Sequence, residues 1–204
     1  MAVFDKAHRS ESLPARIALT LIENGMAAQA NKTVAARNEG LPTLQASLLI
    51  HMHTFNGNGS TVGVLADKMQ LTPPTISDSM KALVRKGYLT RQKSEEDGRV
   101  AYFHLTKKGN NLADRLQSWA DPIEDSIRGL TADQQLELLG ALTRVLRDQV
   151  EAGFAPAEAM CASCGHFRTV SEQGNKFYCI RRDELLSLEE LCVDCPNHVA
   201  CTEQ

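Results

Sequence analysis

The sequence predicts a mainly α-helical (α+β) fold with a small hairpin module at its C-terminal end. Three observations support this fold class. Apolar residues recur at helical spacing through most of the chain. Near the middle, two β-rich segments flank a turn-rich connector, which is the pattern of a hairpin. All six cysteines lie between Cys161 and Cys201, and such clustering is more typical of a metal site than of disulfide bridges.

The first part of the chain has a helical pattern. Residues 13–36 are rich in Ala, Leu and Ile, so we expect one long helix within an N-terminal segment that spans residues 1–42. A second helix is predicted from Thr43 to the turn at residues 56–59, which has the sequence Asn-Gly-Asn-Gly. A short helix is then expected over residues 62–69.

The next predicted helix has clear boundary signals. Thr72 is a good N-cap residue. Pro73 suits the first helical position, because an N–H group at that position has no acceptor within the helix and proline therefore loses no hydrogen bond. Gly87 is a natural C-terminal stop. The apolar face of this helix consists of Ile76, Met80, Leu83 and Val84.

A hairpin follows this helix. Residues 88–93 and 100–106 are β-rich, and the connector at residues 94–99 is rich in turn formers. A winged helix-turn-helix has the order helix, short helix, turn, helix and hairpin. We place this domain at residues 43–109. Two further helices are expected, the first beginning at Lys107 and running to about Leu130, and they make up the segment at residues 110–153.

The charge is unevenly distributed. The whole chain carries a formal charge of −3. Between Asp67 and Lys108, however, nine Lys and Arg residues outnumber five acidic residues. A local excess of positive charge on a winged helix-turn-helix is typical of a protein that contacts the phosphates of duplex DNA.

Two motifs in this region resemble the MarR family of regulators. They are the wing sequence Asp97-Gly98-Arg99 and the following run Leu105-Thr106-Lys107-Lys108-Gly109. The resemblance covers roughly residues 10–150. It implies a winged helix-turn-helix with long dimerisation helices, DNA binding as a homodimer and, more often than activation, repression. It leaves room for a small-molecule effector, for which His51 and His53 are candidate lining residues.

The helical step of 100° per residue turns one face of the predicted recognition helix away from the core. Arg99, at the wing tip, suits the electronegative minor groove. An acid at position 78 is unexpected on a face that meets a polyanion; Asp78 either accepts from a cytosine amino group or weakens non-specific binding. We expect base-edge contacts from Pro74, Thr75, Ser77 and Asp78, and phosphate contacts from Lys81, Arg91 and Lys93.

The predicted long helices offer more apolar surface than the wing domain can cover. A two-fold homodimer would bury these surfaces and present two recognition helices to a palindromic site. We therefore assign residues 1–42 and 110–153 to dimerisation. No window is apolar enough for a membrane helix, and the N-terminus lacks a secretory signal, so we expect a cytoplasmic protein without membrane contact.

Two Cys-x-x-Cys units, Cys161–Cys164 and Cys192–Cys195, lie in the module at residues 154–204. Two Cys-x-x-Cys units suit tetrahedral thiolate coordination of Zn²⁺. Spacing alone favours these four cysteines. Some MarR-like proteins carry a similar extension with an isolated cysteine after a hairpin, and that resemblance favours Cys161, Cys164, Cys179 and Cys195, which we prefer. The result would be a small metal-bound β-hairpin module.

Other interpretations of the cysteines remain open. Four thiolates also hold iron–sulfur clusters, and spare thiols would suit a redox-sensing regulator. A zinc enzyme is the rival from another functional class. The sequence contains no His-Glu-x-x-His element, and an all-thiolate site leaves no open position for water, so we expect no enzyme.

Overall fold

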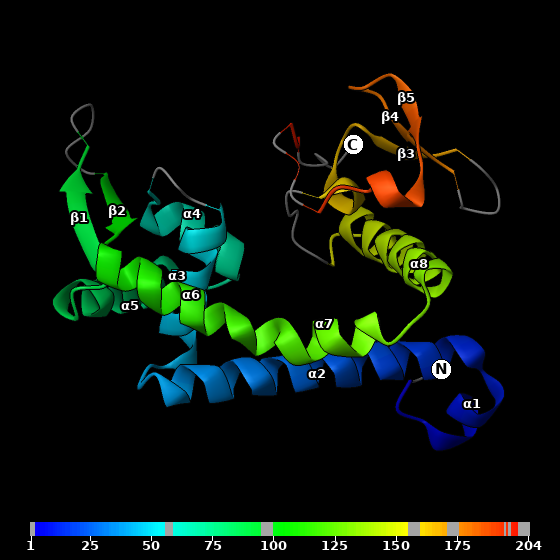
Figure 1. The fold of residues 1–204 in the computed structure, drawn as a ribbon, viewed down its shortest axis with the longest axis horizontal. Helices are drawn as coiled ribbons and strands as arrows, with labels where there is room; N and C mark the ends of the chain where they lie inside the picture. The colour runs from blue at the N-terminus through cyan, green and yellow to red at the C-terminus, as the bar shows by residue number, and fades with distance from the viewer. Residues whose placement is uncertain are drawn as a thin grey trace. The chain divides into compact units, whose positions relative to one another are not determined.

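The computed structural model describes residues 3–55, 59–94, 100–154, 160–170, 176–193, 195 and 197–199 (Figure 1). The chain divides into two compact units, Met1–Asp125 and Ser126–Gln204. The mainly helical α+β fold class is confirmed. None of the helices described combines the length and the apolar character that crossing a bilayer requires.

The N-terminal unit contains the predicted helices and hairpin in the predicted order. The predicted long helix is α2, which begins at Leu13 and is capped by the Ser12 side chain. The elements are α1 (Lys6–Glu11), α2 (Leu13–Asn38), α3 (Thr43–Phe55), α4 (Val62–Met69), α5 (Pro73–Arg85), β1 (Leu89–Lys93), β2 (Ala101–Leu105) and α6 (Lys107–Gln117).

One predicted helix is interrupted. The helix expected from Lys107 to about Leu130 ends at Gln117, and a 3₁₀ turn, η1 (Ser118–Ala120), leads into α7 (Asp121–Arg128). Pro122 accounts for the break. Its ring would clash with the carbonyl of Ser118 in a continuous α-helix, and it has no N–H to donate.

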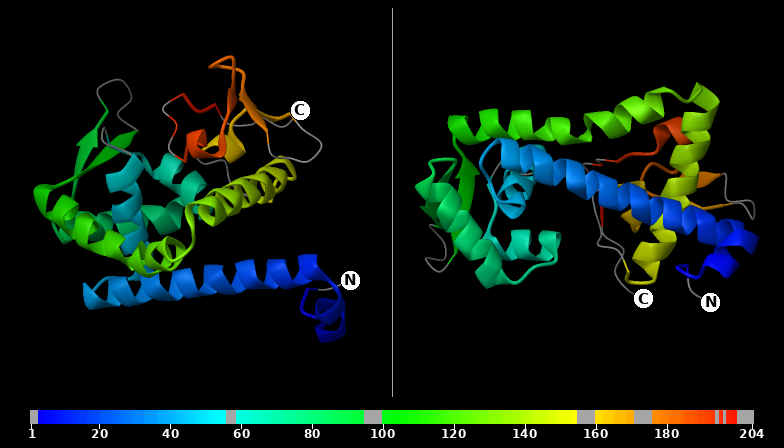
Figure 2. Two further views of the ribbon diagram at one scale, coloured as in Figure 1. Left: turned by 45° about the vertical axis from the view of Figure 1, so that its right-hand side comes forward. Right: turned by 90° about the horizontal axis from the view of Figure 1, so that it is seen from below.

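The core of this unit lies between α3, α4, α5, β2 and α6. Ile76, Met80 and Leu83 of α5 are fully buried, which confirms the predicted apolar face of that helix. Helix α2 runs along α6 and η1 (Figure 2), where Lys32 lies 5.6 Å from the Trp119 ring. The fully buried large side chains of the unit are Leu48, Leu49, Met52, Leu65, Ile76, Met80, Leu83, Leu112 and Leu116.

An ion pair fastens the C-terminal end of α2 to α6. The Arg115 guanidinium donates two hydrogen bonds of 2.9 Å to the Glu39 carboxylate. These hydrogen bonds lower the pKa of Glu39, with the positive charge of Arg115 acting in the same direction. Planar, two-pronged pairing of this kind fixes direction as well as distance.

The wing is a small antiparallel sheet. Strands β1 and β2 pair from Leu89–Leu105 to Lys93–Ala101. A third segment joins them, because Ser60 and Phe103 exchange backbone hydrogen bonds of 3.0 and 2.8 Å. The start of α4 is therefore tied directly to the wing.

The motif at residues 105–109 holds the wing to the end of α5. The Thr106 hydroxyl donates to the Gly87 carbonyl at 2.8 Å and accepts from the Gly109 N–H at 3.0 Å. The Lys108 ammonium donates to the Lys86 carbonyl at 2.9 Å. Gly109 packs so closely that a Cβ there would lie 2.1 Å from the Tyr88 carbonyl oxygen.

The C-terminal unit joins a long helix to the cysteine module. Strands β3 and β4 form the predicted hairpin, and their connector at residues 171–175 lies outside the described residues. A third strand, β5, was not predicted and pairs with β4. The elements are α8 (Ala132–Glu151), η2 (Cys161–Ser163), β3 (Phe167–Thr169), β4 (Phe177–Cys179), β5 (Glu184–Leu186) and η3 (Leu188–Glu190).

Helix α8 and the cysteine module share one core. Phe167 and Phe177 stack with ring centroids 5.2 Å apart, and both are fully buried. Leu139 of α8 packs against this cluster. Gly140 lets Leu188 approach so closely that a Cβ at position 140 would lie 2.5 Å from a Leu188 methyl group. The module thus rests on α8, which we had assigned to dimerisation; that assignment stays a prediction.

Replacing Gly109 by Ala should destabilise the N-terminal unit. The added methyl group collides with the backbone of Tyr88, which cannot rotate away, so we expect a loss of about 1–3 kcal/mol in the free energy of unfolding. The matched control is Gly25→Ala in α2, where a Cβ meets nothing within 4 Å. That change should stabilise the helix by about 0.5–1 kcal/mol. Urea unfolding followed by circular dichroism measures both, and equal effects would contradict the packing described.

Candidate nucleic-acid interface

Helix α5 presents the predicted base-edge residues. Thr72 occupies the N-cap position with extended backbone angles, but its hydroxyl pairs with the Thr75 hydroxyl at 2.9 Å instead of capping a backbone N–H. Pro74, Thr75 and Asp78 are exposed, and Ser77 is half-buried. These side chains therefore occupy the first two turns of the helix, the part of a recognition helix that reaches base edges.

Asp78 has a partner on its own helix. The Lys81 ammonium donates to its carboxylate at 3.2 Å, and both side chains are mostly exposed. Exposed pairs of this kind contribute little to stability. Their effect here is on the surface charge, because the carboxylate offsets one of the positive charges predicted to meet phosphate.

A hollow of about 580 Å³ brings together two of the three predicted phosphate contacts, and Lys93 does not line it. Lys81 from α5 and Arg91 from β1 line it. The start of α4 lines it as well, through Thr61, Val62 and Gly63. The first N–H groups of a helix have no acceptor within the helix, so this end of α4 adds donors for an anion beside two cationic side chains.

Thr61 and Gly63 line this hollow but are not among the contact residues predicted from the sequence. The available signal was the N-cap pattern before residue 62, which marks where a helix starts. In the structure Thr61 is the N-cap of α4, since its hydroxyl accepts from the Val64 N–H. A helix start becomes a candidate phosphate contact only when the fold places it beside cationic side chains, and sequence spacing does not show that.

The hairpin carries the remaining predicted contacts. Arg91 and Lys93 are exposed and, two residues apart on β1, lie on the same face of the strand. Arg91 is paired with Phe103, and Lys93 is paired with Ala101. Arg99, predicted to enter the minor groove, lies with its neighbour Asp97 outside the described residues.

Both histidines of α3 lie among residues of the N-terminal unit. His53 lies between Asn110 and Asp114 of α6, with its ring nitrogens 3.1 and 2.9 Å from their side-chain oxygens. His51 is buried in the core of the unit. These contacts hold α3 to α6, and a role in effector binding stays a prediction.

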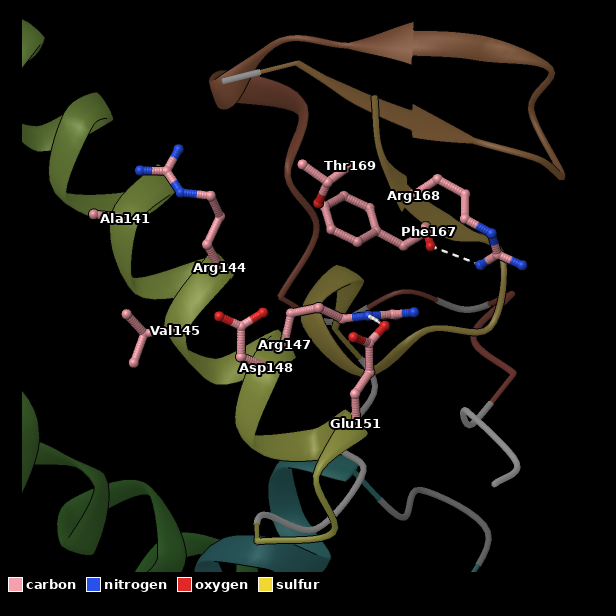
Figure 3. A pocket seen from close by; sticks show the side chains of 9 residues that line it. All are labelled: Ala141, Arg144, Val145, Arg147, Asp148, Glu151, Phe167, Arg168 and Thr169. Carbon is pink, nitrogen blue, oxygen red and sulfur yellow. Dashed lines mark hydrogen bonds and ion pairs between the residues drawn. The ribbon is translucent and has the colours of Figure 1, made fainter. Parts of the chain in front are cut away.

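A second pocket, of about 590 Å³, lies between α8 and β3 in the C-terminal unit (Figure 3). Three of its charged side chains have partners within the unit. Arg147 forms an ion pair with Glu151 and donates to the Cys164 carbonyl, while Arg168 donates to the carbonyls of Gly165 and Phe167. The hydrogen bond from Arg147 to Cys164 braces the module against α8.

The predicted metal ligands lie in two places within the module. Cys161 and Cys164 belong to the η2 turn, and Cys195 lies near the end of the described chain. Cys179 ends strand β4, opposite Phe167. Within the described ranges, no three Cys, His, Asp or Glu side chains form a ready-made metal site. The Zn²⁺ assignment and its ligand set stay predictions.

The comparison with known families identifies the winged region. Residues 39–100 match the model of the MarR family, which confirms the resemblance over that segment. The match ends well before the cysteine-rich segment. No curated protein sequence matches the chain.

Solved structures of similar fold cover about two thirds of the chain. A MarR transcriptional regulator from Methanosarcina mazei Go1 has a TM-score of 0.56 at 20% identity, over 67% of this chain and 97% of its own. A MepR–DNA complex from S. aureus has a TM-score of 0.52 at 22% identity, over 65% and 96%. YusO from Bacillus subtilis has a TM-score of 0.52 at 19% identity, over 65% and 94%. These likenesses show a shared fold.

Replacing Asp78 by Asn should strengthen non-specific DNA binding. The change removes a negative charge from the exposed face of α5 and releases Lys81 for phosphate. We expect tighter binding to an arbitrary duplex and a log–log salt slope steeper by about one. The measurement is fluorescence anisotropy over a range of salt concentrations. Glu137→Gln in α8 removes the same charge from the C-terminal unit and should leave the slope unchanged; a flatter slope for Asp78→Asn would contradict the prediction.

Proposed function

We propose that this chain, whose residues 39–100 match the MarR family, is a DNA-binding transcriptional regulator that represses by occupying a palindromic operator as a homodimer. One observation carries the proposal. Lys81, Arg91 and the start of α4 line a single hollow beside the exposed turns of α5. The MepR structure of similar fold is a complex with DNA, which supports the same function here. The proposal includes no catalytic activity.

The contacts divide into two kinds. The first turns of α5 enter the major groove, where Thr75, Ser77 and Asp78 meet base edges. Lys81, Arg91 and the α4 backbone meet the flanking phosphates, which set the position of the helix without reading sequence. Lys93 and Arg99 extend the contact along the wing.

The dimer is supported by apolar surface that the protomer leaves open. Leu13, Ile17 and Leu21 are spaced four residues apart on α2, and their side chains are 58, 51 and 37% exposed. On α7, Ile123 and Ile127 are 37 and 38% exposed. Contiguous apolar stripes of this kind mark protein interfaces, and a second copy of the chain is the partner that also explains a palindromic operator.

Repression follows from occupancy. A dimer bound across a promoter excludes the transcription machinery, and a ligand that favours another spacing of the two recognition helices would release it. Such a regulator acts where its DNA is, which places the protein in the cytoplasm.

The DNA-binding proposal is tested with basic side chains of the wing. Arg91→Ala should weaken binding to all duplexes and reduce the log–log salt slope by about one, because it removes a phosphate contact. Arg99→Ala should weaken binding to the selected operator by about 1–3 kcal/mol. Operators are first selected from fragmented genomic DNA with the purified protein. Arg181→Ala removes a positive charge from the C-terminal unit and serves as the control. Unchanged operator affinity in both wing variants would overturn the assignment.

The dimer is tested by placing a charge on the apolar stripe of α2. Ile17→Glu should convert the protein to monomers in sedimentation velocity and reduce operator affinity, since burying an unpaired carboxylate in an interface is costly. The helix itself should remain folded because Ile17 is 51% exposed in the protomer. Gln29→Glu introduces the same carboxylate on α2 outside the stripe and should remain dimeric. A monomeric wild-type protein that still binds a palindrome tightly would exclude the dimer.

A further inference from the structure

The two Cys-x-x-Cys units meet in the C-terminal unit. The Cys161 N–H donates to the Cys192 carbonyl at 2.8 Å. In return, the Cys192 N–H donates to the Cys161 sulfur at 3.2 Å. Next to this exchange, the Gly165 N–H donates to the Val199 carbonyl at 2.7 Å. Backbone contacts on both sides thus hold the first unit against the second.

Each unit supplies two cysteines with the same spacing. Cys161 and Cys164 lie at the η2 turn, and Cys192 and Cys195 are likewise three residues apart. Because Cys161 and Cys192 are joined by hydrogen bonds in both directions, the two units lie against each other. Two Cys-x-x-Cys units that meet in this way supply the donors of a tetrahedral thiolate site.

Backbone N–H groups already point at two of these sulfurs. Cys161 accepts from the Cys192 N–H, and Cys195 accepts from the Asn197 N–H. Hydrogen bonds of this kind stabilise the thiolate form, which is the form that coordinates metal.

Cys179 has different surroundings. It ends strand β4, where it pairs with Phe167 on one side and Glu184 on the other. Its carbonyl accepts from the Asp183 N–H at 2.8 Å, so its described hydrogen bonds stay within the hairpin region. Cys192, by contrast, exchanges two hydrogen bonds with Cys161.

The first unit is also braced from α8 and from the end of the chain. The Arg147 guanidinium donates to the Cys164 carbonyl at 2.7 Å. The Ser163 hydroxyl lies 3.0 Å from the His198 ring nitrogen and donates to the Met160 carbonyl. A site at these cysteines would therefore connect α8 with the last described residues of the chain.

We propose that Cys161, Cys164, Cys192 and Cys195 together bind one Zn²⁺ as four thiolates. Binding breaks four S–H bonds, forms four Zn–S bonds and releases four protons to solvent, with no change of oxidation state. The site carries a net charge of −2 and has no open position, so its role is structural. It does not depend on the DNA-binding proposal.

The test measures metal content and coordination in the full-length protein. Wild-type protein purified with zinc should contain one Zn²⁺ per chain, and Co²⁺ in its place should give the intense visible absorption of a tetrahedral thiolate site. Cys192→Ser should lose both signals. Cys179→Ser, the matched control, should keep both. Because a serine variant could also fail to fold, Cys192→His supplies a nitrogen ligand and should restore zinc binding.

Each alternative result overturns the assignment. Loss of zinc in Cys179→Ser with retention in Cys192→Ser would place the hairpin cysteine in the site. Iron and sulfide in the purified wild-type protein would show that these residues hold an iron–sulfur cluster and not zinc. Failure of the wild-type protein to take up zinc or cobalt when its thiols are reduced would exclude the site. None of these outcomes bears on whether Arg91 contacts DNA.

Discussion

The close approach of Gly109 to the Tyr88 carbonyl is the contact on which the winged region depends. It lets the start of α6 lie against the end of α5, where Thr106 then connects Gly87 to the helix that follows the wing. The direction of the hairpin relative to the recognition helix is set at this junction. A motif that first suggests a wing signature is therefore, in physical terms, a tight joint between the hairpin and α5.

The C-terminal unit solves a different problem. A short cysteine-rich segment has too few apolar residues to form a core alone, and here it packs its apolar side chains against α8. Leu139 and Gly140 complete the core around the stacked pair Phe167 and Phe177. Arg147 adds a hydrogen bond from the helix to the first cysteine unit. The proposed zinc would then lock together parts that packing alone already brings close.

Elements with local signals were predictable from the sequence. The apolar face of α5 follows from the spacing of Ile76, Met80 and Leu83, and its start follows from Thr72 and Pro73. The hairpin at β1 and β2 follows from β-rich segments around a turn-rich connector. The break before α7 was missed because the helical pattern continues across Pro122, although that proline interrupts the hydrogen bonds.

Features that depend on distant parts of the chain were not predictable in the same way. The hollow beside α5 needs the start of α4, placed there by the bridge between Ser60 and Phe103. The contact of Cys192 with Cys161 joins the two units that spacing alone favoured, whereas the resemblance favoured Cys179. The third strand of the module, β5, is too short to stand out by pattern. In the first two cases the deciding contact is long-range, whereas β5 pairs with the neighbouring strand β4.

The ion pair between Asp78 and Lys81 has a consequence for how such a protein would find its target. A genome offers about a million or more competing sites for every operator, and each holds a regulator through phosphate charge alone. In the proposed complex, the Asp78 carboxylate would shorten every such stay, while a correct site would recover the loss through base contacts. An acid that lowers the affinity for non-specific DNA would therefore leave more of the protein free to search for its operator.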